Sequence, residues 1–205
     1  MSGSIAIIDY QMGNLRSVQK AIEAVGGHAA ITDDADAIRG ADKVILPGVG
    51  AFADAMDELN ARGLVPILRE SIDAGKPFLG VCLGMQLLFE RGEEGGDCEG
   101  IGALEGRVRK FAIPESLKVP HMGWNSVRSH AADDPMLAGI PDEPYFYFVH
   151  SYYCDPADPS DVWLSCDYGG EFCAAVRRGN LYATQFHPEK SQRHGLQLLR
   201  NFVGL

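Results

Sequence analysis

A regular alternation of two patterns in the first half of the chain restricts its fold more than any other feature. Short apolar runs at residues 5–8, 44–46 and 77–81 predict buried strands. The segments between them repeat apolar side chains at helical spacing, with core-facing positions at Leu15, Val18, Ile22 and Val25 and then at Phe52, Met56 and Leu59. Strands that alternate with amphipathic helices are typical of an α/β domain built around a parallel sheet.

The second half has a different pattern, in which short strand-like runs follow one another closely. Gly, Pro and Asp separate these runs, which predicts hairpins over 107–111, 124–127, 145–149, 162–166, 172–176 and 181–186. Residues 93–97 and 155–161 are expected to be surface loops. A last helix, which Ser191 can cap, presents Leu196, Leu199 and Val203 on one face. We therefore expect one mixed sheet, parallel first and antiparallel later, with helices on both faces.

Composition limits the partners that the chain can bind. The 205 residues include 28 acidic and 18 basic side chains, a formal net charge of −10. We expect no nucleic-acid partner, because phosphate binding needs a basic surface. We also expect no membrane partner, since the longest apolar stretch, 77–89, is shorter than the roughly 20 residues of a spanning helix. The length fits a single domain over 1–205.

The start of the chain and the cysteines indicate a compartment. Residues 1–4 have no basic segment followed by a long apolar one, so no signal peptide is predicted. The five cysteines are an odd number and form no C-x-x-C pair. This usage is typical of free thiols in a reducing compartment, so we expect a cytoplasmic protein.

Cys82 is the candidate nucleophile. It lies in the run Gly80-Val81-Cys82-Leu83-Gly84, where a predicted strand passes into a predicted helix through Met85, Leu88 and Phe89. This is the nucleophile-elbow pattern with sulfur in place of oxygen, and its tight turn needs glycine two residues before and after the nucleophile. The helix N-terminus favours a thiolate, and the amide of Leu83 is one natural oxyanion donor. The alternative is a buried structural cysteine.

His187 and Glu189 are the candidate base and its orienting carboxylate. They follow the run 181–186, and side chains two apart on an extended segment point the same way. A carboxylate beside an imidazole fixes its tautomer and stabilises the imidazolium. Two alternatives are a histidine with a purely structural role and a zinc site, although no further ligand motif completes a zinc site.

The two motifs together resemble class I glutamine amidotransferases. The first is Gly-Val-Cys-Leu-Gly-Met-Gln at 80–86, and the second is Gln-Phe-His-Pro-Glu at 185–189. The segments 8–18, 119–125 and 147–153 further resemble the glutaminase subunits of imidazole glycerol phosphate synthase, over nearly the whole chain. The resemblance implies a flavodoxin-like three-layer sandwich. Gln11 departs from the family, where glycine is more common, so we expect a less flexible loop there.

The resemblance also implies a reaction and a set of residues. Cys82 attacks the carboxamide of L-glutamine, His187 protonates the departing ammonia and Glu189 orients the imidazole; a thioester forms and is hydrolysed to glutamate. No metal and no organic cofactor is implied. Oxyanion donors are expected at Val49, Gly50 and Leu83, and glutamine contacts at Gly50, Gln86, Ser151 and Tyr152. The glycines around Val49 let its peptide rotate, so glutaminase activity is expected to rise when a partner engages.

That partner, by the same resemblance, is a (β/α)₈-barrel cyclase subunit in a heterodimer. It uses the ammonia to make imidazole glycerol phosphate and aminoimidazole carboxamide ribonucleotide. The expected docking residues are Asn14, Trp124, Tyr147 and Lys190. The alternatives are a glutaminase subunit for another acceptor such as chorismate, a stand-alone cysteine hydrolase and a non-catalytic interaction module.

Overall fold

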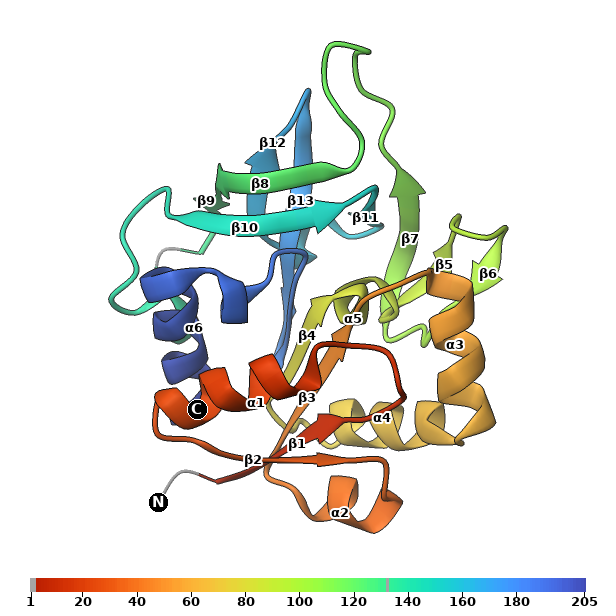
Figure 1. Cartoon of the computed structure of the whole chain (residues 1–205), viewed down its shortest axis with the longest axis vertical. Coiled ribbons are helices and arrows are strands. Elements are labelled where there is room, and N and C mark those ends of the chain that lie inside the picture. The colour runs from red at the N-terminus through yellow and green to blue at the C-terminus, as the bar shows by residue number, and fades with distance from the viewer. Residues whose placement is uncertain (1–2, 132) are drawn as a thin grey trace.

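The computed structural model describes residues 3–131 and 133–205 and centres on one large mixed sheet (Figure 1). Its first part has the order β2-β1-β3-β4-β14, and all neighbours in it are parallel. These strands are β1 (Ser4–Ile8), β2 (His28–Thr32), β3 (Lys43–Gly48), β4 (Phe78–Cys82) and β14 (Leu181–Thr184). Parallel strands place their carboxyl ends at one edge, which is where α/β sheets bind ligands.

The sheet continues through mainly antiparallel strands, as the hairpin pattern predicted. The order beyond β14 is β13-β11-β7-β5-β6, with β12 paired to β13 and β9 paired to β12. These strands are β5 (Phe89–Gly92), β6 (Cys98–Glu99), β7 (Leu104–Lys110), β9 (Arg128–Ser129), β11 (Tyr152–Pro156), β12 (Val162–Asp167) and β13 (Glu171–Arg178). The expected mixed, mostly parallel sheet with antiparallel additions is confirmed.

Two of the predicted strands form a separate sheet instead of joining the main one. β8 (His121–Ser126) pairs antiparallel with β10 (Tyr145–His150), with Tyr147 opposite Trp124 and His150 opposite His121. This β8–β10 ribbon lies across the end of the main sheet (Figure 1). Its inner face is apolar, since Phe146 and Phe148 are fully buried, and its outer face carries the exposed Met122 and Trp124.

Helices cover both faces of the parallel strands. α1 (Leu15–Ala24) and α6 (Gln192–Gly204) lie on one side, and α2 (Ala35–Gly40), α3 (Phe52–Ala61), α4 (Leu64–Asp73) and α5 (Leu83–Gln86) on the other (Figure 1). Single turns of 3₁₀ helix occur at η1 (Pro135–Leu137), η2 (Pro159–Asp161) and η3 (Pro188–Lys190). The expected three-layer α/β architecture is confirmed.

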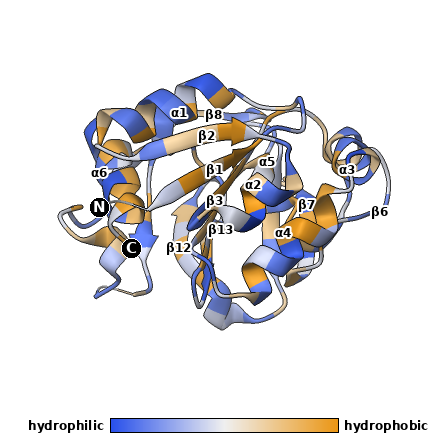
Figure 2. Cartoon of the chain, turned by 90° about the horizontal axis from the view of Figure 1, so that it is seen from below, coloured by the Kyte–Doolittle hydropathy of each residue, from blue (hydrophilic) through white to orange (hydrophobic). Residues whose placement is uncertain are grey.

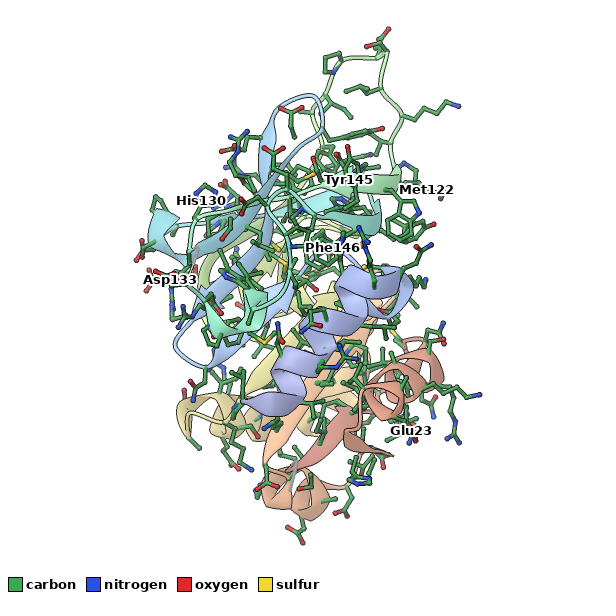
Figure 3. All side chains as sticks on the ribbon, turned by 90° about the vertical axis from the view of Figure 1, so that its left-hand side faces the viewer. Glu23, Met122, His130, Asp133, Tyr145 and Phe146 are labelled. Carbon is green, nitrogen blue, oxygen red and sulfur yellow. The ribbon has the colours of Figure 1, made fainter. Side chains whose placement is uncertain are left out.

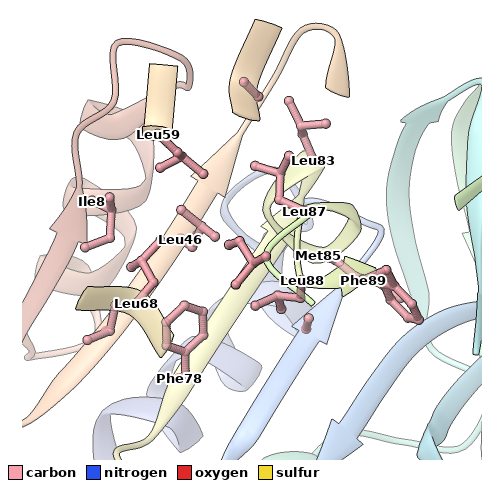
Figure 4. Packing of buried hydrophobic residues seen from close by; sticks show 14 of the residues in the cluster. Ile8, Leu46, Leu59, Leu68, Phe78, Leu83, Met85, Leu87, Leu88 and Phe89 are labelled. Atoms are coloured by element: carbon pink, nitrogen blue, oxygen red, sulfur yellow. The ribbon is translucent and has the colours of Figure 1, made fainter. Parts of the chain in front are cut away.

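The two apolar layers follow from the alternation of side chains along the central strands. In β1, Ile5 and Ile7 pack toward α1 and α6, while Ala6 and Ile8 pack toward α3 and α4. The central strands are accordingly hydrophobic, and the helices are hydrophilic where they face solvent (Figure 2). Figure 4 shows the second layer, in which Leu46 and Phe78 pack with Leu68 of α4. No helix among the described residues is long and apolar enough to span a membrane.

Several local expectations are wrong. The helix after Cys82 ends at Gln86, and Phe89 begins β5 because it pairs with Leu104 of β7. The segment 155–161 is not only a surface loop, since Asp161 is buried and accepts a hydrogen bond from Arg178 Nε at 3.0 Å. The sequence interpretation missed β2 and α2, which are short, and also α4, although its Leu64, Ile67 and Leu68 form a buried apolar face.

Candidate active site

Cys82 lies at a sharp turn between β4 and α5. Its φ of 56° and ψ of −112° are unusual for a residue with a side chain, a conformation that costs on the order of 1–3 kcal/mol and persists only where packing enforces it. An added Cβ at Gly84 would overlap the carbonyl oxygen of Leu46 in β3, and one at Gly80 would lie 3.0 Å from Leu88 Cδ1. Both glycines are therefore required by close neighbours, and the elbow expected from the sequence is present.

His187 reaches the same edge of the sheet from a neighbouring strand. β14 runs parallel to β4 with Thr184 beside Val81, so the residues after β14 emerge next to Cys82. His187 Nδ1 lies 2.8 Å from Glu189 Oε1, and both side chains are almost fully buried. The two groups meet as expected, but the proposed reason was wrong: the strand ends at Thr184, and the turn η3 brings the carboxylate back to the imidazole.

The charge of His187 is set by its two neighbours. Burial acts to lower the pKa of His187, but Cys82 and Glu189 outweigh it and raise this pKa to about 9. The remaining ring nitrogen, Nε2, is buried without a hydrogen-bond partner among the described residues. The site therefore holds a histidine that keeps its proton at neutral pH and has one nitrogen available for proton transfer.

Ser191 holds this histidine in place instead of capping α6. Its hydroxyl donates to the carbonyl oxygen of His187 at 2.6 Å and accepts from the amide of Tyr147 at 2.9 Å. The amide of His187 donates to the carbonyl oxygen of Tyr147 at 3.0 Å. The expected cap of α6 is wrong, because Ser191 makes no side-chain cap hydrogen bond. The β8–β10 ribbon instead supports the segment that carries the imidazole.

A cavity of about 310 Å³ opens beside Cys82 and His187. It brings together every residue expected to bind glutamine or an oxyanion, and its lining is Val49, Gly50, Cys82, Leu83, Gln86, Glu94, Pro120, Val149, His150, Ser151, Tyr152 and His187. A larger cavity lined by His130 and Trp163 lies elsewhere and contains none of these residues. The volume near Cys82 suits a small ligand with a few polar contacts.

Gln86 is buried one turn after Cys82, as its position predicted. Its side-chain nitrogen donates to the carbonyl oxygen of Tyr152 at 3.1 Å and to Gln185 Oε1 at 2.9 Å. Gln185 Nε2 in turn lies 3.8 Å from the sulfur of Cys82, within the range of a weak hydrogen bond to sulfur. The sequence interpretation did not single out Gln185, although it belongs to the motif at 185–189.

Glu94 is a lining residue that sequence reasoning missed, because 93–97 was expected to be only a surface loop. Its carboxylate accepts a hydrogen bond from the amide of Phe52 at the start of α3, at 2.9 Å. This contact holds a negative charge beside the cavity that Glu94 lines. The available signal was the apolar pattern of α3 after residue 50. This pattern predicts a helix N-terminus there, and helix N-termini attract carboxylates.

The segment Val49–Gly50 follows β3 at the same edge. Val49 is exposed, and Gly50 has a φ of 108°, which side-chain-bearing residues rarely adopt. On the other side of Cys82, α5 has only a single turn. The positive potential at the Cys82 sulfur therefore comes from the first amides of that turn and not from a long helix dipole. Gln11 also has a positive φ, 65°, a conformation that glycine adopts without strain.

The expected docking residues lie near one another. Trp124 is exposed, and its ring centroid is 6.2 Å from that of Tyr147 across the β8–β10 ribbon. Lys190 Nζ lies 6.0 Å from the Tyr147 ring centroid. Asn14 is exposed at the start of α1, which packs beside η3. Figure 3 shows Met122 extending outward from the same ribbon, while Phe146 points into the body toward α6.

A thiol at a strand–helix elbow, with a histidine–carboxylate pair from the adjacent parallel strand, defines a cysteine-dependent hydrolytic centre in an α/β fold. Among the residues that the structure describes, no group of His, Cys, Asp and Glu side chains could hold a metal ion. The model of the family "Glutamine amidotransferase class-I" matches residues 6–204. The chain therefore belongs to the class I glutamine amidotransferases.

Two relatives and one solved structure show which members of this family the chain is similar to. The chain is similar to the imidazole glycerol phosphate synthase subunit HisH of Rhodopirellula baltica, with 60% identity over 97% of this chain and 96% of that protein. It is 51% identical to the HisH subunit of Methylococcus capsulatus, over 98% of this chain and 95% of that one. The solved structure of PurLQS from Thermotoga maritima has a TM-score of 0.79 at 20% identity, covers 100% of this chain and 99% of that one, and shows the shared fold.

Proposed function

We propose that this chain is the glutaminase subunit of imidazole glycerol phosphate synthase in L-histidine biosynthesis. The observation that carries the proposal is the cavity beside Cys82, which is lined by His187, an imidazole with a raised pKa that is paired with Glu189. Relatives that share 50–60% of their residues with this chain are named as subunits of that synthase, which supports this acceptor over chorismate. Residues 1–205 then form one class I amidotransferase domain.

The reaction begins with attack of the Cys82 sulfur on the carboxamide carbon of L-glutamine. The amide of Leu83 and an amide of the Val49–Gly50 segment stabilise the negative oxygen that develops, and losing one such donor costs about 3 kcal/mol in the transition state. The His187 imidazolium gives its proton to the departing nitrogen, which leaves as ammonia. His187 then takes a proton from water, which attacks the thioester and releases glutamate.

Glutamine is held by polar groups that line the cavity. These groups include the backbone of Gly50, Ser151 and Tyr152 and the side chain of Gln86. We place the α-ammonium group of glutamine against Glu94, whose carboxylate lies at the cavity and carries the complementary charge. No cofactor is needed, because cysteine and histidine supply both the nucleophile and the proton transfers.

The ammonia is used by a partner, since free ammonia becomes ammonium in water and loses its nucleophilicity. We propose a heterodimer with a (β/α)₈-barrel cyclase subunit that docks on Asn14, Trp124, Tyr147 and Lys190. Trp124 is exposed and the half-buried Tyr147 lies beside Lys190, and such aromatic side chains are typical anchors of an interface. The five unpaired cysteines support a reducing, cytoplasmic location.

Partner binding is proposed to activate the glutaminase by reorienting the Val49–Gly50 peptide. The exposure of Val49 and the positive φ of Gly50 leave this peptide free to rotate at low cost. An amide turned into the cavity completes the oxyanion site, and an amide turned away leaves it with one donor. Equal glutamine turnover by the isolated chain and by the heterodimer would contradict this mechanism.

The decisive experiment mixes the chain with the cyclase subunit and its phosphoribulosyl-formimino nucleotide substrate. Glutamate and imidazole glycerol phosphate are both measured, with Cys82→Ala as the control. We expect both products to form together and to disappear in the variant. Glutamate release that is the same with and without the cyclase indicates a stand-alone hydrolase. Release that responds to another acceptor enzyme indicates a different amidotransferase. No release indicates a non-catalytic module.

A further inference from the structure

A second pair of histidines lies next to the catalytic one and has no part in the proposed reaction. His121 and His150 face each other across the β8–β10 ribbon, and His121 Nδ1 lies 3.0 Å from His150 Nε2. The other nitrogen of His150, Nδ1, lies 2.8 Å from the carbonyl oxygen of Tyr152.

These contacts fix where the protons are. A carbonyl oxygen only accepts, so Nδ1 of His150 carries the proton and Nε2 of a neutral ring accepts. His121 must then donate from its own Nδ1, which leaves its Nε2 to accept from Asn125 Nδ2 at 3.4 Å. Both imidazoles are therefore Nδ1–H tautomers, each donating in the direction of Tyr152.

The surroundings keep both rings neutral. His121 stacks between Tyr168 and Phe148, with centroids 4.0 and 4.9 Å away, and His150 lies against Phe111. Burial lowers the pKa of His121 to about 4. Burial also lowers the pKa of His150 to about 3; its bond to Tyr152 acts in the opposite direction, and the nearby His121 and His187 lower it further.

The pair is joined to the nucleophile by a continuous chain of hydrogen bonds. The carbonyl oxygen of Tyr152 accepts from His150 and also from Gln86 Nε2. Gln86 donates to Gln185, and Gln185 Nε2 lies within 3.8 Å of the Cys82 sulfur. The orientation of the Tyr152 peptide thus affects both the position of the backbone that lines the pocket and the direction of the Gln86 side chain.

We propose that His121 and His150 are positioning residues for glutamine: a neutral imidazole pair that locks the Ser151–Tyr152 wall of the pocket and, through it, Gln86. This role rests on the proposed glutaminase function, since it needs glutamine to occupy the cavity. Neither ring transfers a proton in the reaction. The pair also ties the pocket wall to β8, the strand that carries Trp124.

Kinetics of the complete heterodimer test the proposal. His121→Phe keeps a flat ring between Tyr168 and Phe148 but removes the donor to His150, so that the buried Nε2 of His150 loses its hydrogen-bond partner. We expect the KM for glutamine to rise about tenfold, the equivalent of one hydrogen bond, while kcat changes less than about threefold, because a substrate-holding wall acts on bound glutamine and transition state alike. His121→Asn, which can donate from nearly the same place, should restore part of the lost KM.

A matched control uses a histidine outside the pocket. His130 also makes a side-chain hydrogen bond, to Ser165 Oγ at 3.0 Å, and does not line the glutamine cavity. His130→Phe should leave KM unchanged. An unaltered KM in a folded His121→Phe protein, or an equal rise in His130→Phe, overturns the proposal. Failure of the proposed function looks different, because the unmodified heterodimer then releases no glutamate at all.

A spectroscopic measurement on the unmodified protein decides the matter if the variants do not fold. Long-range ¹H–¹⁵N correlation spectra of histidine-labelled heterodimer distinguish the two neutral tautomers and the charged form. We expect two rings with protonated Nδ1 and unprotonated Nε2, unchanged from pH 5.5 to 8.5. A His150 ring that is protonated on Nε2, or that becomes charged in this range, overturns the proposal.

Discussion

The strained backbone of Cys82 and the raised pKa of His187 are connected, because the first brings the sulfur close to the imidazole. The positive φ of Cys82 turns its side chain out of the strand direction and toward the neighbouring strand end. The sulfur then stands close enough to His187 to favour the imidazolium, and Glu189 stabilises the same charge from the other side. A histidine that holds its proton to about pH 9 is suited to protonate a departing ammonia at neutral pH.

The variant Glu189→Gln tests the orienting carboxylate. Its loss removes one of the interactions that raise the pKa of His187, so the alkaline limit of kcat/KM should move below about pH 9. Loss of the correct ring orientation should also lower kcat on the order of 10³-fold. The measurement is the pH profile of glutamate release by the heterodimer.

The exposed Glu115 supplies the control, since Glu115→Gln removes one carboxylate that is not among the groups shifting the pKa of His187 and should leave the profile unchanged. An alkaline limit that stays in place in Glu189→Gln would show that the carboxylate does not set the charge of the imidazole.

Stability should depend on pH through the same histidine. Its pKa is about 9 in the folded chain and about 6.5 in the unfolded chain, so between these values the folded state binds more protons. The stabilising contribution is complete below about pH 6.5 and is lost as the pH rises through 9. Urea unfolding of the unmodified chain and of His187→Asn should show a stability difference that shrinks across this window; a constant difference would contradict the raised pKa.

At the scale of elements, the site depends on how closely three strands approach. β3, β4 and β14 are parallel neighbours, so their carboxyl ends deliver Val49, Cys82 and His187 to one edge. The first turn of α5 lies against the end of β3, which leaves no space for a side chain at Gly84. The elbow is therefore a property of the strand packing as much as of the local sequence.

Substitution of Gly84 by alanine should destabilise the protein. The new methyl group would overlap the Leu46 carbonyl oxygen, and such overpacking costs about 1–3 kcal/mol. Gly40→Ala is the matched control, because a Cβ at the end of α2 meets nothing within 4 Å and should change stability by less than about 1 kcal/mol. Urea unfolding midpoints compare the two. Similar midpoints for both variants would mean that the approach of β3 does not constrain the elbow.

For the whole molecule, the important arrangement is that of the β8–β10 ribbon over the edge of the main sheet (Figure 1). Its inner face packs into the apolar core through Phe146 and Phe148, and its backbone holds His187 through Tyr147 and Ser191. Its outer face is exposed at Trp124. A partner that docks there therefore touches an element in direct hydrogen-bond contact with the catalytic segment.

Trp124→Ala should weaken the heterodimer about tenfold or more, because truncating an aromatic anchor removes buried contact area. Leu205→Ala is the control: Leu205 is 42% exposed, close to the 45% of Trp124, but lies at the chain end. Titration calorimetry with the cyclase subunit measures both. Unaltered affinity in Trp124→Ala would place the docking surface elsewhere.

Much of the fold and the identity of the reactive groups could be predicted from the sequence. The apolar runs 5–8 and 44–46 are buried strands because such runs are stable only inside a sheet. The elbow motif predicted the turn at Cys82, since only glycine fits beside it. The half-exposed strand β2, which the sequence interpretation missed, is stabilised by packing on its neighbours and has a weak pattern of its own, whereas α4 was overlooked although Leu64, Ile67 and Leu68 form a buried apolar face.

The sequence by itself determined which groups this protein has for chemistry: a thiol between two glycines, and an imidazole two residues from a carboxylate. Both are local, because they depend on chain geometry over a few residues. Only the tertiary structure decided that His121 meets His150, that Glu94 reaches the cavity and that Ser191 holds the His187 segment instead of a helix end. Those contacts join residues far apart in the chain, and their partners are selected by the packing of whole strands, which no short pattern records.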